Sequence, residues 1–109
     1  MGDLTIQLDR DSTPGIHRAV LAGPLDNRTA DGFDEWLRKY SEHFGTEGTL
    51  HLDMAKLECL SSRAISSIVY YYDKFQQAGG KLHLVKVPPT ASVSLEKLGF
   101  GNLDLIITD

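Results

Sequence analysis

Two adjacent serines and an arginine, Ser61, Ser62 and Arg63, are the residues whose types and spacing most clearly allow chemistry. They stand directly before a run with helical periodicity, where a serine commonly caps the helix by accepting a hydrogen bond from a free backbone amide. The same position suits a modifiable hydroxyl, because a helix N-terminus favours negative charge and a phosphate adds about -1.5 to -2 charges. The residues alone leave both interpretations open, a structural cap and a modification site.

Other reactive side chains carry weaker signals. His51 and His83 could lie side by side on adjacent strands, but no third or fourth ligand follows at a recognisable spacing, so we expect surface histidines and no metal. Cys59 lies in an apolar segment, where a cysteine usually behaves as a small hydrophobic residue and not as a nucleophile. The serines lack the flanking glycines of a nucleophile elbow, and the glycine pairs lack the pattern of a nucleotide-binding loop. We therefore expect no enzymatic activity and no cofactor.

Composition limits the class of protein. The 109 residues are 41% hydrophobic and carry a net charge of -4, with scattered basic residues and a single cysteine. This balance argues against nucleic acid or an anionic membrane as the main partner, and no apolar run approaches the roughly 20 residues of a membrane span. We expect one domain over residues 1–109, without a signal peptide, in the cytoplasm.

The hydrophobic pattern that must position the serines alternates between strand and helix. It predicts strands at 4–9, 16–22, 49–54, 81–87 and 103–108, and helices from Asp26 or Asn27 to near Gly45, from Ser61 or Ser62 to Gly79, and from Thr90 to Gly99. Turn residues between the first two strands predict an antiparallel hairpin, and strands joined through a helix must be parallel. The expected fold is therefore α/β, a mixed sheet of about five strands.

Polar residues within the strands indicate where the helices lie. His51, Asp53 and His83 alternate with the apolar residues of their strands, so one face of the sheet should be polar and the helices should gather mainly on the other. We expect a single core that contains Trp36, Leu52, Ile65, Ile68 and Leu84. At most one residue of the run Tyr70-Tyr71-Tyr72 belongs to that core, and the helical pattern favours Tyr72.

The order of several segments resembles a known family. The segments GPLDNRTADGF, LHLDMAKLECLSSRAI, AGGKLHLVKVPP and LEKLGF look like the successive landmarks of STAS domains, specifically the single-domain anti-sigma factor antagonists of bacteria. The likeness spans nearly the whole chain, and its specificity lies in the order and spacing of the segments. Ser61 stands where the family usually has aspartate, Arg63 where it has serine or threonine, and Ala64 where it has glycine.

The resemblance implies a partner-switching protein that is phosphorylated on Ser62. In such proteins an anti-sigma factor that is also a serine protein kinase adds the phosphate, a PP2C-type phosphatase removes it, and the unphosphorylated antagonist binds the kinase and releases the sigma factor. We assign six neighbouring residues to the partner-binding surface: Asp26, Asn27, Thr29, Ser61, Arg63 and Ser66.

Two other functions remain open. The chain could be a STAS-like interaction or scaffold module of a signalling complex that is never phosphorylated. It could also be a ligand-binding or enzymatic domain with a pocket at the helix starts, although no acid, base and nucleophile stand together to support that function.

Overall fold

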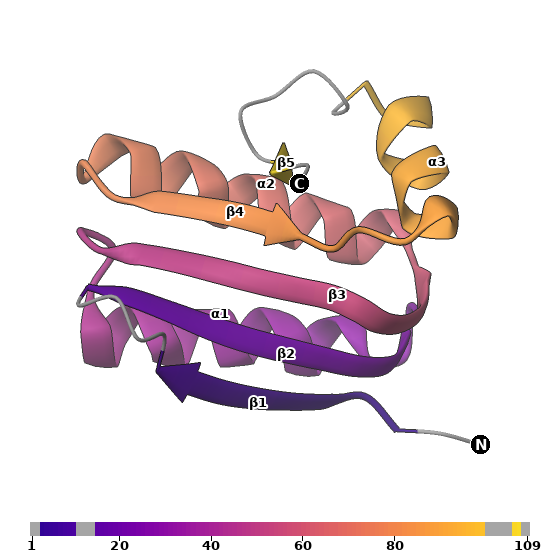
Figure 1. Cartoon of the computed structure of the whole chain (residues 1–109), viewed down its shortest axis with the longest axis horizontal. Coiled ribbons are helices and arrows are strands. Elements are labelled where there is room, and N and C mark those ends of the chain that lie inside the picture. Colours follow the sequence, from indigo (N-terminus) through magenta and orange to yellow (C-terminus); the bar gives the residue numbers. More distant parts are fainter. Residues whose placement is uncertain (1–2, 11–14, 100–105, 108–109) are drawn as a thin grey trace.

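The computed structural model describes residues 3–10, 15–99 and 106–107 of the chain. Strand and helix alternate after an initial pair of strands (Figure 1). The elements are β1 (Thr5–Arg10), β2 (Ile16–Leu25), α1 (Ala30–Phe44), β3 (Thr49–Leu60), α2 (Ser62–Gln77), β4 (Lys81–Val85), α3 (Pro89–Lys97) and β5 (Ile106–Ile107). This order confirms the predicted α/β fold.

The strands form one mixed sheet in the order β1-β2-β3-β4-β5. β1 is antiparallel to β2, and the pairs β2–β3, β3–β4 and β4–β5 are parallel, which confirms the predicted hairpin and crossovers. Four strands are long, whereas β5 contributes two residues. The remainder of the strand predicted at 103–108 lies outside the described residues.

Helices α1 and α2 cover the same face of the sheet, and α3 lies beyond the carboxyl end of β4 (Figure 1). Between the sheet and these helices lies one core, in which the fully buried large side chains include Phe33, Leu52, Ile65, Ile68 and Leu84. Trp36 was wrongly expected in this core. It is partly buried against the margin of the core, because its side chain borders two surface hollows that are also lined by Ile6 and Leu8 of β1.

The third strand is longer than its alternating pattern predicts. β3 continues past Met54 to Leu60, with two register irregularities against β2. The first follows Asp53, whose carboxylate accepts a hydrogen bond from the backbone amide of Ala55, 3.0 Å away. Each irregularity changes which residues face the core, and this is why Leu57 and Leu60 are buried although the simple alternation ends earlier.

On the polar face of the sheet, one residue is more buried than the sequence predicts. His51 and His83 are paired across β3 and β4, with ring centroids 5.5 Å apart, as predicted. Asp53 was expected on the polar face of the sheet, but only 6% of it is exposed. Its carboxylate lies 3.6 Å from Nη1 of Arg18 and 3.9 Å from Nζ of Lys86, and these long side chains supply opposite charge beside it.

Two further details of the helices differ from the sequence prediction. The core tyrosine of α2 is Tyr71, not Tyr72, because the buried residues follow the spacing 64, 68, 71 and 75. Helix α3 begins at Pro89, one residue before the predicted cap Thr90, since proline suits the first helical turn, where its missing amide hydrogen is not needed.

Candidate functional site

Two strand-to-helix turns meet at the carboxyl ends of β2 and β3. One runs from Leu25 to Ala30, and the other passes through Ser61 into α2. A backbone hydrogen bond from the amide of Ser61 to the carbonyl of Leu25, 2.8 Å long, joins them directly. Carboxyl ends of neighbouring parallel strands lie at the same edge of a sheet, so the topology brings the two turns together.

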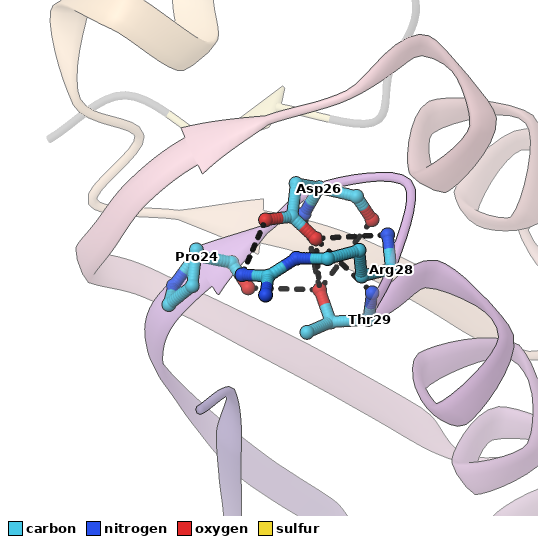
Figure 2. Close-up of polar contacts among 4 residues, drawn as sticks. All are labelled: Pro24, Asp26, Arg28 and Thr29. Atoms are coloured by element: carbon cyan, nitrogen blue, oxygen red, sulfur yellow. Dashed lines mark hydrogen bonds and ion pairs between the residues drawn. The ribbon is translucent and has the colours of Figure 1, made fainter. Parts of the chain in front are cut away.

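The first turn is held by Asp26 and Thr29 (Figure 2). Oδ1 of Asp26 accepts hydrogen bonds from the amides of Arg28 and Thr29, at 2.9 and 3.1 Å. In return Oγ1 of Thr29 accepts from the amide of Asp26 at 3.0 Å and donates to the carbonyl of Pro24 at 2.8 Å. Asp26 therefore closes the turn before α1, but the N-cap position of the helix is Thr29, so the prediction that Asp26 or Asn27 caps the helix was wrong. Asn27 is an exposed residue of that turn.

The electrostatics of this turn favour an ionised carboxylate. Partial desolvation raises the pKa of Asp26, but the amides of Thr29 and Arg28 and the Arg28 guanidinium, whose Nη2 lies 3.3 Å from Oδ2, outweigh it. The net result is a pKa below the ordinary aspartate value. The hydrogen bonds and the ion pair of the Asp26 carboxylate described here thus lie within its own turn.

The second turn separates the two serines that the sequence left equivalent. Ser61 occupies the N-cap position of α2 in an extended conformation, and its hydroxyl accepts a hydrogen bond from the amide of Ala64 at 3.2 Å. Ser62 is the first residue of α2 and is exposed. Ser66, one turn later, donates its hydroxyl to the carbonyl of Ser62 at 3.2 Å. Of the two serines at the helix start, Ser61 is the cap and Ser62 presents its side chain to solvent.

Arg63 connects the starts of the two helices. Its guanidinium forms an ion pair with the carboxylate of Asp31, in the first turn of α1. Both side chains are exposed, so a new anion near the start of α2 can compete for Arg63. No sequence pattern indicates that Asp31 lies here, because the contact spans 32 residues along the chain.

Helix α3 adds a surface that sequence reasoning missed. A shallow groove of about 190 Å³ lies beside Ser62, with an apolar floor that includes Leu60 and Ile65. Lys97 and Leu98, at the end of α3, form its other side. Both residues belong to the segment LEKLGF, but nothing in that segment indicates that they lie near Ser62, since only the packing of α3 beside β3 places them near the start of α2.

The described residues give little support for a metal site or for a reactive thiol. Within residues 3–10, 15–99 and 106–107, no three His, Cys, Asp or Glu residues are grouped so that they could hold a metal ion. Cys59 is partly buried in β3. None of the helices described is both long and apolar enough to span a membrane.

The chain belongs to the STAS domain family, whose model matches residues 7–108. No curated protein sequence matches it. Among solved structures, it resembles the anti-sigma factor antagonist SpoIIAA in its unphosphorylated form, with a TM-score of 0.74 and 17% identity over 96% of this chain and 90% of that one. It also resembles a putative anti-sigma factor antagonist from Thermotoga maritima, with a TM-score of 0.80 and 15% identity over 97% and 86% of the chains.

A third similar structure belongs to a much larger protein. The murine anion transporter Slc26a9 matches with a TM-score of 0.69 and 17% identity, over 88% of this chain but only 16% of the transporter. At such identities these likenesses concern the fold. The same fold therefore occurs both in small antagonist proteins and as a minor part of a transporter.

Proposed function

We propose that this protein is an anti-sigma factor antagonist that works by partner switching. Unphosphorylated, it binds an anti-sigma factor that is also a serine kinase, and phosphorylation of Ser62 releases it. The observation that carries this proposal is the division between the two serines, in which Ser61 caps α2 and Ser62 is exposed beside it. A residue at the rim of a sheet, in front of a helix, can enter a kinase active site without unfolding of the domain.

The helix start tolerates a phosphate. First-turn amides and the aligned peptide dipoles of α2 favour negative charge, and the Arg63 side chain begins one residue away. An interface that accommodates the neutral hydroxyl, in contrast, would receive up to two unpaired charges, which cost several kcal/mol. Release would thus come from repulsion and desolvation, with the fold unchanged.

The partner surface would contain the two joined turns. Asn27 and Arg63 are exposed there, Asp26 and Thr29 hold the first turn in shape, and Ser61 caps the second. Ser66 extends the surface by one helical turn. A PP2C-type phosphatase would reverse the modification, and the protein would act in the cytoplasm as a single domain of residues 1–109.

The test is incubation with a candidate anti-sigma factor kinase and ATP, followed by intact-mass measurement and peptide mapping. We expect one added phosphate on Ser62, none in Ser62→Ala, and normal modification of the control Ser41→Ala, near the far end of α1 and outside the two turns. The separated forms are then titrated with the kinase, and the phosphorylated form should bind more weakly. Modification of Ser66, or equal affinity of both forms, contradicts the proposal.

A scaffold function is the second candidate, favoured by the match to part of the Slc26a9 transporter, where a domain of this fold belongs to a much larger protein. In that case the two turns would bind a partner permanently. Tight binding to the kinase without any phosphorylation would support it over switching.

A further inference from the structure

A second surface lies between the edge strand β1 and helix α1. Two adjoining cavities of about 370 and 270 Å³ share Trp36 as a common wall. The first is lined by Ile6 and the start of α1, and the second by Leu8 and the end of α1. β1 and α1 therefore run in the same direction, and Trp36, which borders both cavities, lies level with the middle of β1. The two cavities together are called here the Trp36 groove.

The floor of the Trp36 groove is apolar. Leu4, Ile6 and Leu8 alternate with exposed polar residues of the strand and are only partly buried against the core. On the helix side Trp36 is also partly buried, and Phe44 is 43% exposed. Covering these side chains with other apolar side chains would remove apolar surface from water, which is favourable.

The sheet ends at this groove. β1 is the outermost strand, and among the described strands only β2 pairs with it (Figure 1). Edge strands that avoid further pairing often carry proline, lysine or a bulge. β1 has neither proline nor lysine, its pairing with β2 is continuous, and its charged residues Asp9 and Arg10 stand at one end. Its outer backbone groups can therefore pair with an added strand.

The strand that best fits this edge is β1 of a second copy. An added strand must carry an apolar side chain at every second position to cover the groove, and β1 itself has this pattern. A two-fold axis perpendicular to the sheet would pair two β1 strands antiparallel, with both α1 helices on one face. Centred on Gln7, this pairing puts Ile6 opposite Leu8 of the second copy. Centred on Ile6, it would put Asp3 opposite Asp9, and like charges in that position are destabilising.

The charges along the groove fit the same symmetry. Because Trp36 is level with the middle of β1, an axis at that level places the start of each α1 beside the end of the other. Asp3 lines the first cavity, whereas Lys39 and His43 line the second, so these opposite charges would face each other across the axis. Arg28, which also lines the first cavity, is paired within its own turn. Within the part of the chain that the structure describes, Asp3 and Lys39 have no ion pair of their own.

We propose that two copies of this chain form a symmetric dimer, in which the β1 strands join two sheets into one and the Trp36 grooves cover each other. Ser62 lines neither cavity, and α2 begins after β3, two strands away from the β1 edge. The inference therefore does not depend on the role of Ser62.

The test is sedimentation equilibrium of the protein from about 5 to about 500 µM, a range in which a dimer with a micromolar Kd becomes the main species. We expect the mass to rise from that of one chain towards that of two. Trp36 is the only tryptophan of the chain, so its emission should shift over the same range of concentration. In a mixture of isotope-labelled and unlabelled protein, a filtered NOE experiment should connect Ile6 with Leu8 of the other copy.

Variants separate the β1 edge from the rest of the surface. Gln7→Lys, at an exposed position, puts two like charges opposite each other at the axis and should weaken association at least about tenfold. The same change at the end of α2, Gln77→Lys, should leave association unchanged. Lys39→Glu should weaken it about threefold, whereas Lys56→Glu, on β3 outside both linings, should not. Urea denaturation checks that each variant keeps the stability of the parent.

Three results overturn the proposal. One is a protein that stays monomeric at about 500 µM, the top of the range in which a micromolar dimer forms. Another is a dimer that Gln7→Lys leaves intact, or whose NOE contacts between copies lie on α2 and not on β1. The third is saturable binding of oleate or of an apolar peptide to the groove of a monomeric protein, since this assigns the groove another occupant.

Discussion

The turn after β2 and the turn after β3 lie at the same edge of the sheet and both lead into a helix, yet their polar side chains have different uses. In the first turn Asp26 and Thr29 bond to each other's backbone and close the turn on itself. In the second Ser61 alone caps the helix, and Ser62 is left exposed. Rotating a side chain out of a turn that it stabilises by hydrogen bonds lowers the stability of the fold. An exposed side chain can be modified without that loss.

This difference changes what Asp26 is expected to do. A carboxylate engaged with two backbone amides and a guanidinium supports the shape of the turn more than it reaches outward. We expect Asp26 to act on a partner mainly by presenting exposed Asn27 and Arg28. Variants in the two turns and in the core that carries them should therefore differ in their effects.

The largest effect on stability is expected for a core residue of α2, the helix that follows the second turn. Ile68 is fully buried on the face of α2 that packs on the sheet, so Ile68→Ala should lower the free energy of unfolding by about 2 to 5 kcal/mol. Urea denaturation measures this, with Val93→Ala, at a site that is 49% exposed, as the control with little effect. If Ile68→Ala is as stable as the parent, the two turns do not share one core.

The two serines should differ next. Ser61→Ala removes the cap of α2 and should cost about 1 kcal/mol, whereas Ser62→Ala should change stability by less than about 0.5 kcal/mol. Urea denaturation of both variants gives the comparison directly. A larger loss in Ser62→Ala would mean that Ser62, and not Ser61, holds the helix start.

The sequence predicted the elements better than the contacts between them. Alternation and helical spacing were sufficient for the hairpin, the parallel strands and the placement of α1 and α2 on one face. The extension of β3 to Leu60 was missed, because bulges break the alternation that identifies a strand. Asp31 and Lys97 were missed as neighbours of the serines, since each comes from another helix and only the folded chain brings them near.

Acid should weaken the closed turn. The folded-state pKa of Asp26 lies below its unfolded value, so the ionised carboxylate contributes stability above the unfolded pKa, and that contribution is lost as the pH falls through the folded pKa. The stability difference between the parent and Asp26→Asn should therefore be greatest near neutral pH and shrink below about pH 4. Thr29→Val, which removes the reciprocal bonds but keeps the carboxylate, should lose stability and retain a dependence on pH. A difference between parent and Asp26→Asn that is constant from neutral to acidic pH contradicts the role given to the charge.

The smallest effect concerns the link between the turns. Arg63 and Asp31 are 57% and 74% exposed, so a double-mutant cycle of Arg63→Gln and Asp31→Asn should give a coupling of only about 0.2 to 1 kcal/mol. Phosphorylation of Ser62 sharpens the test, because a phosphate with up to two charges at the start of α2 competes with the single charge of Asp31 for the guanidinium. In the phosphorylated protein the coupling should fall toward zero, because Arg63 is then no longer paired with Asp31. A coupling that is unchanged by phosphorylation would show that Arg63 stays with Asp31 and that the phosphate is held by the helix start alone.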